Sequence, residues 1–141
     1  MSQSDKKCVM VIDANLPLGV IANTSAILGV SIGKQAPQAV GADVLDASGM
    51  THPGIITVPI TVLKGDESLL KTLRARLYEP EYAEMQVADF SNVAQSCNIY
   101  EEYILSAAET PEREHTYYGV AIYGDKKKVN RLTGFLPLLR A

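Results

Sequence analysis

Five consecutive apolar residues, Cys8-Val-Met-Val-Ile12, constrain the fold more than any other segment of the chain. A strand with one wet face alternates apolar and polar side chains, whereas a strand that is covered on both faces does not. We therefore predict that residues 7–12 form a strand in the middle layer of the protein.

Strand and helix patterns alternate along the rest of the chain. Pro17 suits the first turn of a helix that runs to about residue 32. Further strands are predicted at 55–63, 84–88 and 116–123, and helices begin after Asp66, after Asp89 or Ser91, and after Asp125. This alternation predicts a three-layer α/β/α domain with a mixed sheet.

Three local features refine this prediction. Pro59 cannot donate to a strand ladder, so the strand at 55–63 is expected to lie at the sheet edge or to be bulged. Small residues on the first helix predict a close approach to its neighbour, and they are Ala22, Ala26, Gly29 and Gly33. The helix after residue 91 is expected to carry Ala107 on its buried face and to end at Thr110-Pro111.

The chain of 141 residues is expected to fold as a single domain. Residues 1–6 form a polar tail in this interpretation, and residues 34–54 form a hairpin-like insert that turns at 46–49. Apolar residues make up 47% of the chain and charged residues 21%, which is typical of a folded globular protein rather than a disordered one.

Charge and residue usage exclude several classes of function. A net charge of −3 makes a nucleic-acid partner unlikely on electrostatic grounds, because such surfaces are usually basic. No apolar run approaches membrane-spanning length, so we expect a cytoplasmic protein without membrane contact. Two cysteines and two histidines lack metal-ligand spacing, and no nucleotide-binding loop motif is present, so neither a metal nor a cofactor is expected.

Polar residues follow the first strand, where α/β sheets commonly bind ligands. Asp13, Asn15 and Gly19 lead into a helix that carries Asn23 and Thr24. Free backbone N–H groups at the start of that helix favour an anion or a carbonyl oxygen. The alternative is that Asp13 and Asn15 only form a turn.

A second polar group lies between residues 88 and 92. Asp89 could act as a base and Ser91 as a hydrogen-bond donor, although either residue could equally cap a helix. His52 follows a predicted turn and could reach a cleft, so a Ser91–His52–Asp89 arrangement can be written. The alternative for His52 is an exposed loop position. His115 is expected to be solvated.

Several segments resemble the peptidyl-tRNA hydrolase II fold. Residues 7–16, followed by Gly19 and a helix with small residues, resemble its opening. Residues 62–69 resemble its second strand and capped helix, and residues 124–138 resemble its last helix, Thr-Gly turn and Leu-rich end. The resemblance covers most of the chain outside 34–54, and it implies a peptidyl-tRNA hydrolase II-like fold and a homodimer.

Residues 15–19, 22–23 and 52–54 resemble more narrowly an uncharacterised bacterial family of unknown function on the same fold. Peptidyl-tRNA hydrolase II carries a lysine just after the glycine that opens its first helix, whereas this chain has Val20 there. That family also carries a Gln-Cys-x-His-type run within the same helix, whereas residues 23–26 of this chain contain no histidine. Only Asp89 remains of that family's Asp-Ala-Gly-x-Thr run. Without these cationic and polar groups, the chain would stabilise the transition state of peptidyl-tRNA cleavage less than that family does.

The sequence therefore leaves three functions open, and it does not decide whether the protein is an enzyme. The first is a cytosolic binding or regulatory domain for a small polar ligand or an anion. The second is a diverged hydrolase of an ester or amide, with Asp89 or His52 as the base. The third and least favoured is peptidyl-tRNA hydrolysis.

Overall fold

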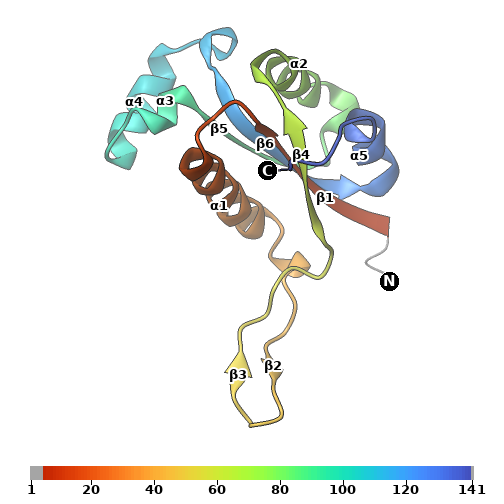
Figure 1. The fold of residues 1–141 in the computed structure, drawn as a ribbon. Helices are drawn as coiled ribbons and strands as arrows, with labels where there is room; N and C mark the ends of the chain where they lie inside the picture. Colours follow the sequence, from red (N-terminus) through yellow and green to blue (C-terminus); the bar gives the residue numbers. More distant parts are fainter. Residues whose placement is uncertain (1–4, 141) are drawn as a thin grey trace.

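A four-stranded mixed sheet forms the middle of the protein in the computed structural model, which describes residues 5–140 (Figure 1). Its strand order is β4-β1-β6-β5, with β1 parallel to β4 and β6 antiparallel to both of its neighbours. The strands are β1 (Lys6–Asp13), β4 (Ile60–Gly65), β5 (Gln86–Ser91) and β6 (Tyr117–Asp125). At one end of the sheet, β1, β4 and β5 terminate and β6 begins. We call this end the carboxyl edge; it runs across the strands, unlike the lateral edges that β4 and β5 form.

Helices cover both faces of this sheet (Figure 1). On one face lies α1 (Leu18–Gln35), and on the other lie α2 (Glu67–Leu77) and α5 (Lys126–Thr133). Two further helices follow β5, namely α3 (Asn92–Gln95) and α4 (Tyr100–Glu109). The remaining short elements are the 3-10 turns η2 (Pro37–Ala39), η3 (Pro80–Tyr82) and η4 (Glu112–Glu114) and the strands β2 (Val44–Leu45) and β3 (Thr51–His52).

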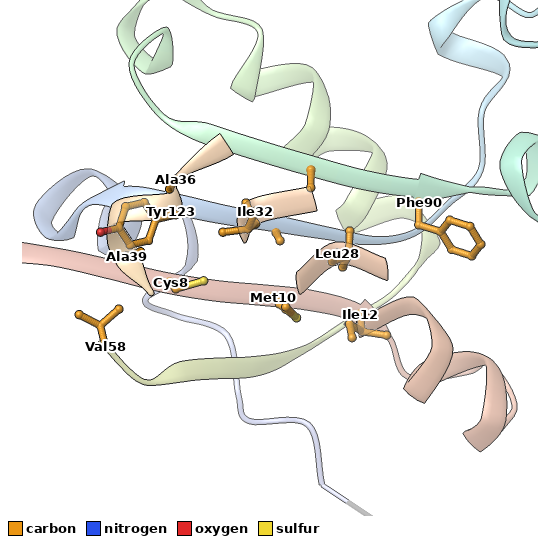
Figure 2. Close-up of a cluster of buried hydrophobic side chains, with 12 residues drawn as sticks. Cys8, Met10, Ile12, Leu28, Ile32, Ala36, Ala39, Val58, Phe90 and Tyr123 are labelled. Atoms are coloured by element: carbon orange, nitrogen blue, oxygen red, sulfur yellow. The ribbon is translucent and has the colours of Figure 1, made fainter. Parts of the chain in front are cut away.

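The predicted double-sided burial of the first strand is confirmed. All residues from 8 to 12 are buried, and their side chains alternate between two core clusters. Cys8, Met10 and Ile12 lie on the α1 side of the sheet, where Leu28 and Ile32 pack against them (Figure 2). Val9 and Val11 lie on the α2 and α5 side. One strand thus joins two cores, which is why its sequence has no polar alternation.

Two predicted helix caps are also confirmed. The Asp66 carboxylate accepts a hydrogen bond from the Leu69 backbone N–H at 2.8 Å, at the start of α2. The Asp125 carboxylate accepts one from the Lys128 N–H at 3.1 Å, at the start of α5. Each cap pairs a backbone donor that the helix itself leaves without a partner.

The strand predicted at 55–63 begins later, at Ile60, immediately after Pro59. It lies at the edge of the sheet, as expected for a segment whose proline cannot donate to a ladder. The end of the chain runs along its outer side: the Lys64 N–H donates to the Pro137 carbonyl, and the Leu139 N–H donates to the Val62 carbonyl. These bonds cover part of an edge that would otherwise be open to pairing.

The boundaries of the tail and of the insert differ from the prediction. Residues 1–4 of the proposed tail lie outside the described residues, and Lys6 already belongs to β1. Within the insert, α1 continues to Gln35, and the hairpin of β2 and β3 turns through Gly49, whose φ is +80°. Figure 1 shows this hairpin projecting from the body of the protein.

The stripe of small residues on α1 does not face one neighbour, contrary to expectation. Ala22 and Ala26 are exposed, whereas a Cβ at Gly29 would lie 3.7 Å from the Met10 Cε. The helix packs on the sheet through other residues, which are Thr24, Leu28 and Ile32. Spacing alone identified a stripe but not the direction in which it faces.

Removal of a side chain from the α2 core should cost far more stability than the same change on an exposed helix. Leu70 is fully buried, so we expect Leu70→Ala to lower the free energy of unfolding by about 2–5 kcal/mol. Leu105 is exposed on α4, so Leu105→Ala should change it by about 0.5 kcal/mol or less. Urea denaturation measures both values, and equal losses would contradict this description of the core.

Candidate functional site

Asp89 and Ser91 lie within β5 rather than in a turn after it, because the strand runs to residue 91, past the predicted end at 88. Neither side chain caps a helix: α3 begins after Ser91 without a side-chain cap, and the Asp89 Oδ2 lies 2.7 Å from the Arg74 Nε. The Arg74 and Asp89 side chains are 13% and 23% exposed. This ion pair joins β5 to α2.

The single helix predicted after residue 91 is broken into α3 and α4. The Glu102 Oε1 accepts hydrogen bonds from the backbone N–H groups of Asn98 and Ile99, at 2.9 and 3.4 Å. A glutamate that satisfies the first N–H groups of a helix favours a new helix start at that point. The break leaves a linker of residues 96–99 beside the sheet.

Ser91 and His115 form a pair at the carboxyl edge that sequence reasoning did not find. The Ser91 Oγ lies 3.3 Å from the His115 Nδ1, and the His115 Nε2 lies 3.2 Å from the Thr110 carbonyl oxygen. A carbonyl only accepts, so the Nε2 atom carries the proton. In the neutral ring the Nδ1 atom then accepts from the Ser91 hydroxyl. This is the arrangement of a serine and its base.

His115 is therefore half-buried rather than solvated, which corrects the expectation from its charged neighbours. Its ring stacks on Tyr117 with centroids 6.0 Å apart. The Tyr117 hydroxyl donates to the Glu112 Oε2 at 2.7 Å. Burial, and next the bond to Glu112, raise the pKa of Tyr117, so this hydroxyl keeps its proton and remains a donor.

Lys71 brings a positive charge to the same place. Its Nζ donates to the backbone carbonyls of Glu112, at 3.1 Å, and of His115. It also lies 5.5 Å from the centroid of the Tyr117 ring. Carbonyl partners orient the ammonium group without neutralising its charge, so Lys71 still attracts an anion.

A cavity of about 410 Å³ opens between α2 and the segment that precedes β6. Its lining is largely polar and contains Glu67, Ser68, Lys71, Thr72, Arg113, Glu114, His115 and Thr116. We call it the edge cavity. Its size and its mixture of hydroxyl groups, cations and a histidine suit a small polar ligand.

The β1–α1 junction lies next to the start of α2 along the carboxyl edge. Asp13 pairs in register with Gly65, and the following residue, Asp66, caps α2. Asp13 is buried, and its Oδ1 accepts from the Asn15 N–H at 2.9 Å, as in the turn alternative. Asn15, Gly19 and Asn23 are exposed.

Thr24 occupies a different position from its neighbours on the first helix. It is fully buried, and its Cγ2 lies above Gly119 of β6. Among residues 5–140, its Oγ1 is a buried side-chain oxygen without a hydrogen-bond partner. A buried hydroxyl without a partner carries an energetic cost, and its inward direction separates it from the exposed Asn23.

The structure does not bring His52 to the other candidates, so the Ser91–His52–Asp89 arrangement does not form. His52 lies on the projecting hairpin, where its Nε2 is 2.8 Å from the Asp46 Oδ2. Both side chains are exposed. The hairpin closes on its own turn residues, which keeps this histidine away from the sheet.

Lys71, Tyr117 and His115 are the site residues that sequence reasoning missed or misplaced. From the sequence alone, Lys71 fits the preference for cations in the carboxyl-terminal half of a helix, and Tyr117 fits an aromatic residue of the core. Neither signal indicates that residues 71 and 115 meet, because that contact depends on how α2 packs beside β6.

Among residues 5–140, no group of three or more His, Cys, Asp or Glu side chains is placed to hold a metal ion. Within the same range, no helix combines the length and the apolar character that crossing a membrane requires.

Comparisons with known proteins place the chain among relatives without an assigned activity. A family model described as "Protein of unknown function (DUF2000)" matches residues 6–140. The solved structure of a protein of unknown function from Agrobacterium tumefaciens is similar, with a TM-score of 0.86 and 19% identity over 97% of this chain and 98% of that one. At this identity the likeness shows a shared fold alone. No curated protein matches the chain.

The His52–Asp46 pair on the hairpin should be detectable as a lowered Asp46 pKa in a pH titration. The hydrogen bond from His52, and next those from the Met50 and Ser48 N–H groups, hold the pKa of Asp46 below its ordinary value. Folding thus favours the charged carboxylate, so this contribution to stability is present above the ordinary aspartate pKa and is lost as the pH falls through the folded value. We expect His52→Ala to raise the Asp46 pKa in a carboxyl NMR titration.

The control for this titration is His115→Ala, which removes the other histidine far from the hairpin. It should leave the Asp46 pKa unchanged. An Asp46 pKa that is the same in His52→Ala and in the parent protein contradicts the assigned pair.

Proposed function

Since the chain belongs to the DUF2000 family, whose description assigns no activity, we propose a function from its own site: the carboxyl edge binds a small polar or anionic ligand. The observation that carries this proposal is the placement of Lys71. Its ammonium group is held by two backbone carbonyls at the wall of the edge cavity, and its charge is available to a carboxylate or phosphate group.

The other walls of the edge cavity supply directional groups. Ser68 and Thr72 offer hydroxyl groups from α2, and His115 offers a ring that donates or accepts according to its protonation. Ser68 also lies in the first turn of α2, where the helix dipole favours a negative charge. Glu67 and Glu114 on the rim oppose a highly charged ligand, so we infer a ligand of low charge.

The β1–α1 junction is the second part of the proposed binding region. Asn15, Gly19 and Asn23 are exposed there, and the start of α1 is capped by no side chain. Asp13 and Thr24, both buried, would support the junction from beneath rather than contact the ligand directly. Asp89 would act in the same indirect way through its ion pair with Arg74.

A diverged hydrolase is the second candidate, and the Ser91–His115 pair is the observation that favours it. The Ser91 Oγ would attack an ester or amide carbonyl while its proton passes to the His115 Nδ1, and the ring would return that proton to the leaving group. Ser91 is only 1% exposed, so a substrate reaches its Oγ only if the residues packed over it move. This requirement places the hydrolase second.

The broader proposal is a cytoplasmic homodimer with a peptidyl-tRNA hydrolase II-like fold. The mixed sheet with helices on both faces is consistent with that fold. Cleavage of peptidyl-tRNA itself ranks last. The chain has Val20 where that family carries a lysine, and the run that begins at Asn23 lacks the histidine that the family carries in its first helix.

Loss of the Lys71 charge should weaken ligand binding without unfolding the protein. The probes are inorganic phosphate, citrate and adenosine monophosphate, each titrated by calorimetry and by thermal shift. A probe at 100 times its Kd stabilises the folded state by about 2.7 kcal/mol. We expect at least one probe to bind, with an affinity about tenfold lower or worse in Lys71→Met.

The matched control is Lys127→Met, which removes an exposed lysine from α5, away from the edge cavity. It should bind the probe as the parent protein does. Binding that is unchanged in Lys71→Met, or lost equally in both variants, would overturn the edge cavity as the site.

A separate assay tests the hydrolase. With p-nitrophenyl esters, Ser91→Ala and His115→Gln should each lower the rate by about 100-fold or more, since a nucleophile and its base act as a unit. Ser96→Ala, an exposed serine in the same region, should have no effect. Equal rates in Ser91→Ala and Ser96→Ala would rule out this mechanism while leaving ligand binding intact.

A further inference from the structure

A second cavity, of about 440 Å³, lies at the end of the sheet opposite the carboxyl edge. At this end β1 and β4 begin and β6 ends, so the first residues of β1 lie beside the start of α5 (Figure 1). We call it the lysine cavity, because three lysines line it. Its lining includes Lys6, Lys7 and Lys126 together with Thr57, Pro59 and Thr61. Among residues 5–140, none that lines this cavity carries a carboxylate.

The pairing of the strands brings the three lysines to one place. Lys6 pairs in register with Asp125 of β6, and Lys126 is the next residue along the chain. On the other side of β1, Cys8 pairs with Ile60, so the segment that leads into β4 runs past Lys6 and the residue after it. The cluster therefore joins the start of β1 to the start of α5, and the sequence alone does not show it.

The protein does not neutralise these three ammonium groups. Within residues 5–140, none of them takes part in an ion pair. The Lys7 Nζ donates to the Asn130 Oδ1 at 2.6 Å, and a neutral amide orients an ammonium group without cancelling its charge. Another cation of α5 is treated differently, since the Arg131 Nη1 donates to the Glu81 Oε2 at 2.6 Å. The helix thus pairs Arg131 with an acid and leaves the charge of Lys126 to the cavity.

Hydrogen bonds fix one wall of the lysine cavity. The Thr57 N–H and the Thr57 hydroxyl both donate to the Ala39 carbonyl oxygen, at 2.8 and 3.0 Å. Pro59 follows and restricts the backbone where the chain enters β4. Thr61, on β4 itself, adds a hydroxyl group that can donate to a ligand. A wall that is already ordered loses little conformational freedom when a ligand binds.

We propose that the lysine cavity binds an anion with two or more linked phosphate groups. Ammonium groups that surround one cavity repel one another, and an anion of several charges removes this repulsion. Lysine binds phosphate as a point charge, and linked phosphates present several acceptor oxygens side by side. The volume of the cavity lies within the range of small-molecule sites.

The charge of the ligand separates this site from the edge cavity. Glu67 and Glu114 line the edge cavity and oppose a highly charged ligand there, whereas the described lining of the lysine cavity contains no acid. The two cavities have no lining residue in common and lie at opposite ends of the sheet. The proposal therefore goes beyond the proposed function and does not depend on it.

Calorimetric titration tests the site with pyrophosphate and with adenosine triphosphate, each without Mg²⁺ and at an ionic strength of about 0.15 M. We expect the parent protein to bind at least one of them, and Lys6→Met and Lys126→Met each to raise the Kd about tenfold or more. Lys126→Arg keeps the charge and should retain binding. Equal affinities for the two probes would show that the phosphate groups alone are recognised, and tighter binding of the nucleotide would add a contact with the nucleoside. Both results support the site.

The matched control is Lys127→Met, which removes the neighbouring exposed lysine outside the cavity lining. It should bind pyrophosphate as the parent protein does, and circular dichroism verifies that every variant folds. No binding of either probe, or an equal loss in Lys127→Met, overturns the proposal. A loss in Lys71→Met instead assigns the probe to the edge cavity and also overturns it. So does a short single-stranded DNA that binds more tightly than both probes and depends on Lys127 as much as on Lys126, because that result describes a nucleic-acid surface.

Discussion

The burial of β1 on both faces is the constraint on which the rest of the structure depends. One strand supplies side chains to both core clusters, so α1 and the α2–α5 pair are held at opposite faces of the same segment. Its register with β4 and β6 then determines which residues reach the carboxyl edge, where Asp13 lies beside Gly65 and the start of β6. A shift of one residue would exchange the two faces, so the position of the site follows from the packing of this strand.

Much of the fold could be predicted because its signals are local. The apolar run of β1, the caps at Asp66 and Asp125 and the turn before residue 50 each depend on neighbours within a few residues, and the structure contains all of them. The break between α3 and α4 was missed although its cause is also local. Glu102 bonds backwards to backbone N–H groups, and hydrophobic periodicity is blind to that contact.

The candidate site was less predictable, for a physical reason. Its pairs join residues far apart in the chain: Arg74 meets Asp89, and Ser91 meets His115. Such pairs depend on strand order and on the direction of a helix over the sheet, and neither is encoded in the spacing of the residues concerned. Residues 89 and 91 have side chains that suit catalysis, and the sequence shows this, but it does not show that Ser91 meets His115 rather than His52 on the hairpin.

The strand order has a consequence for how the protein is made. The strand β6 lies between β1 and β5 in the sheet, yet it is the last strand in the chain, and the segment that covers the outer side of β4 follows it. A ribosome therefore releases the apolar β1 segment long before its central neighbour exists. The sheet closes only after β6 has emerged, so until then the growing chain exposes an apolar strand without its central neighbour, which favours aggregation.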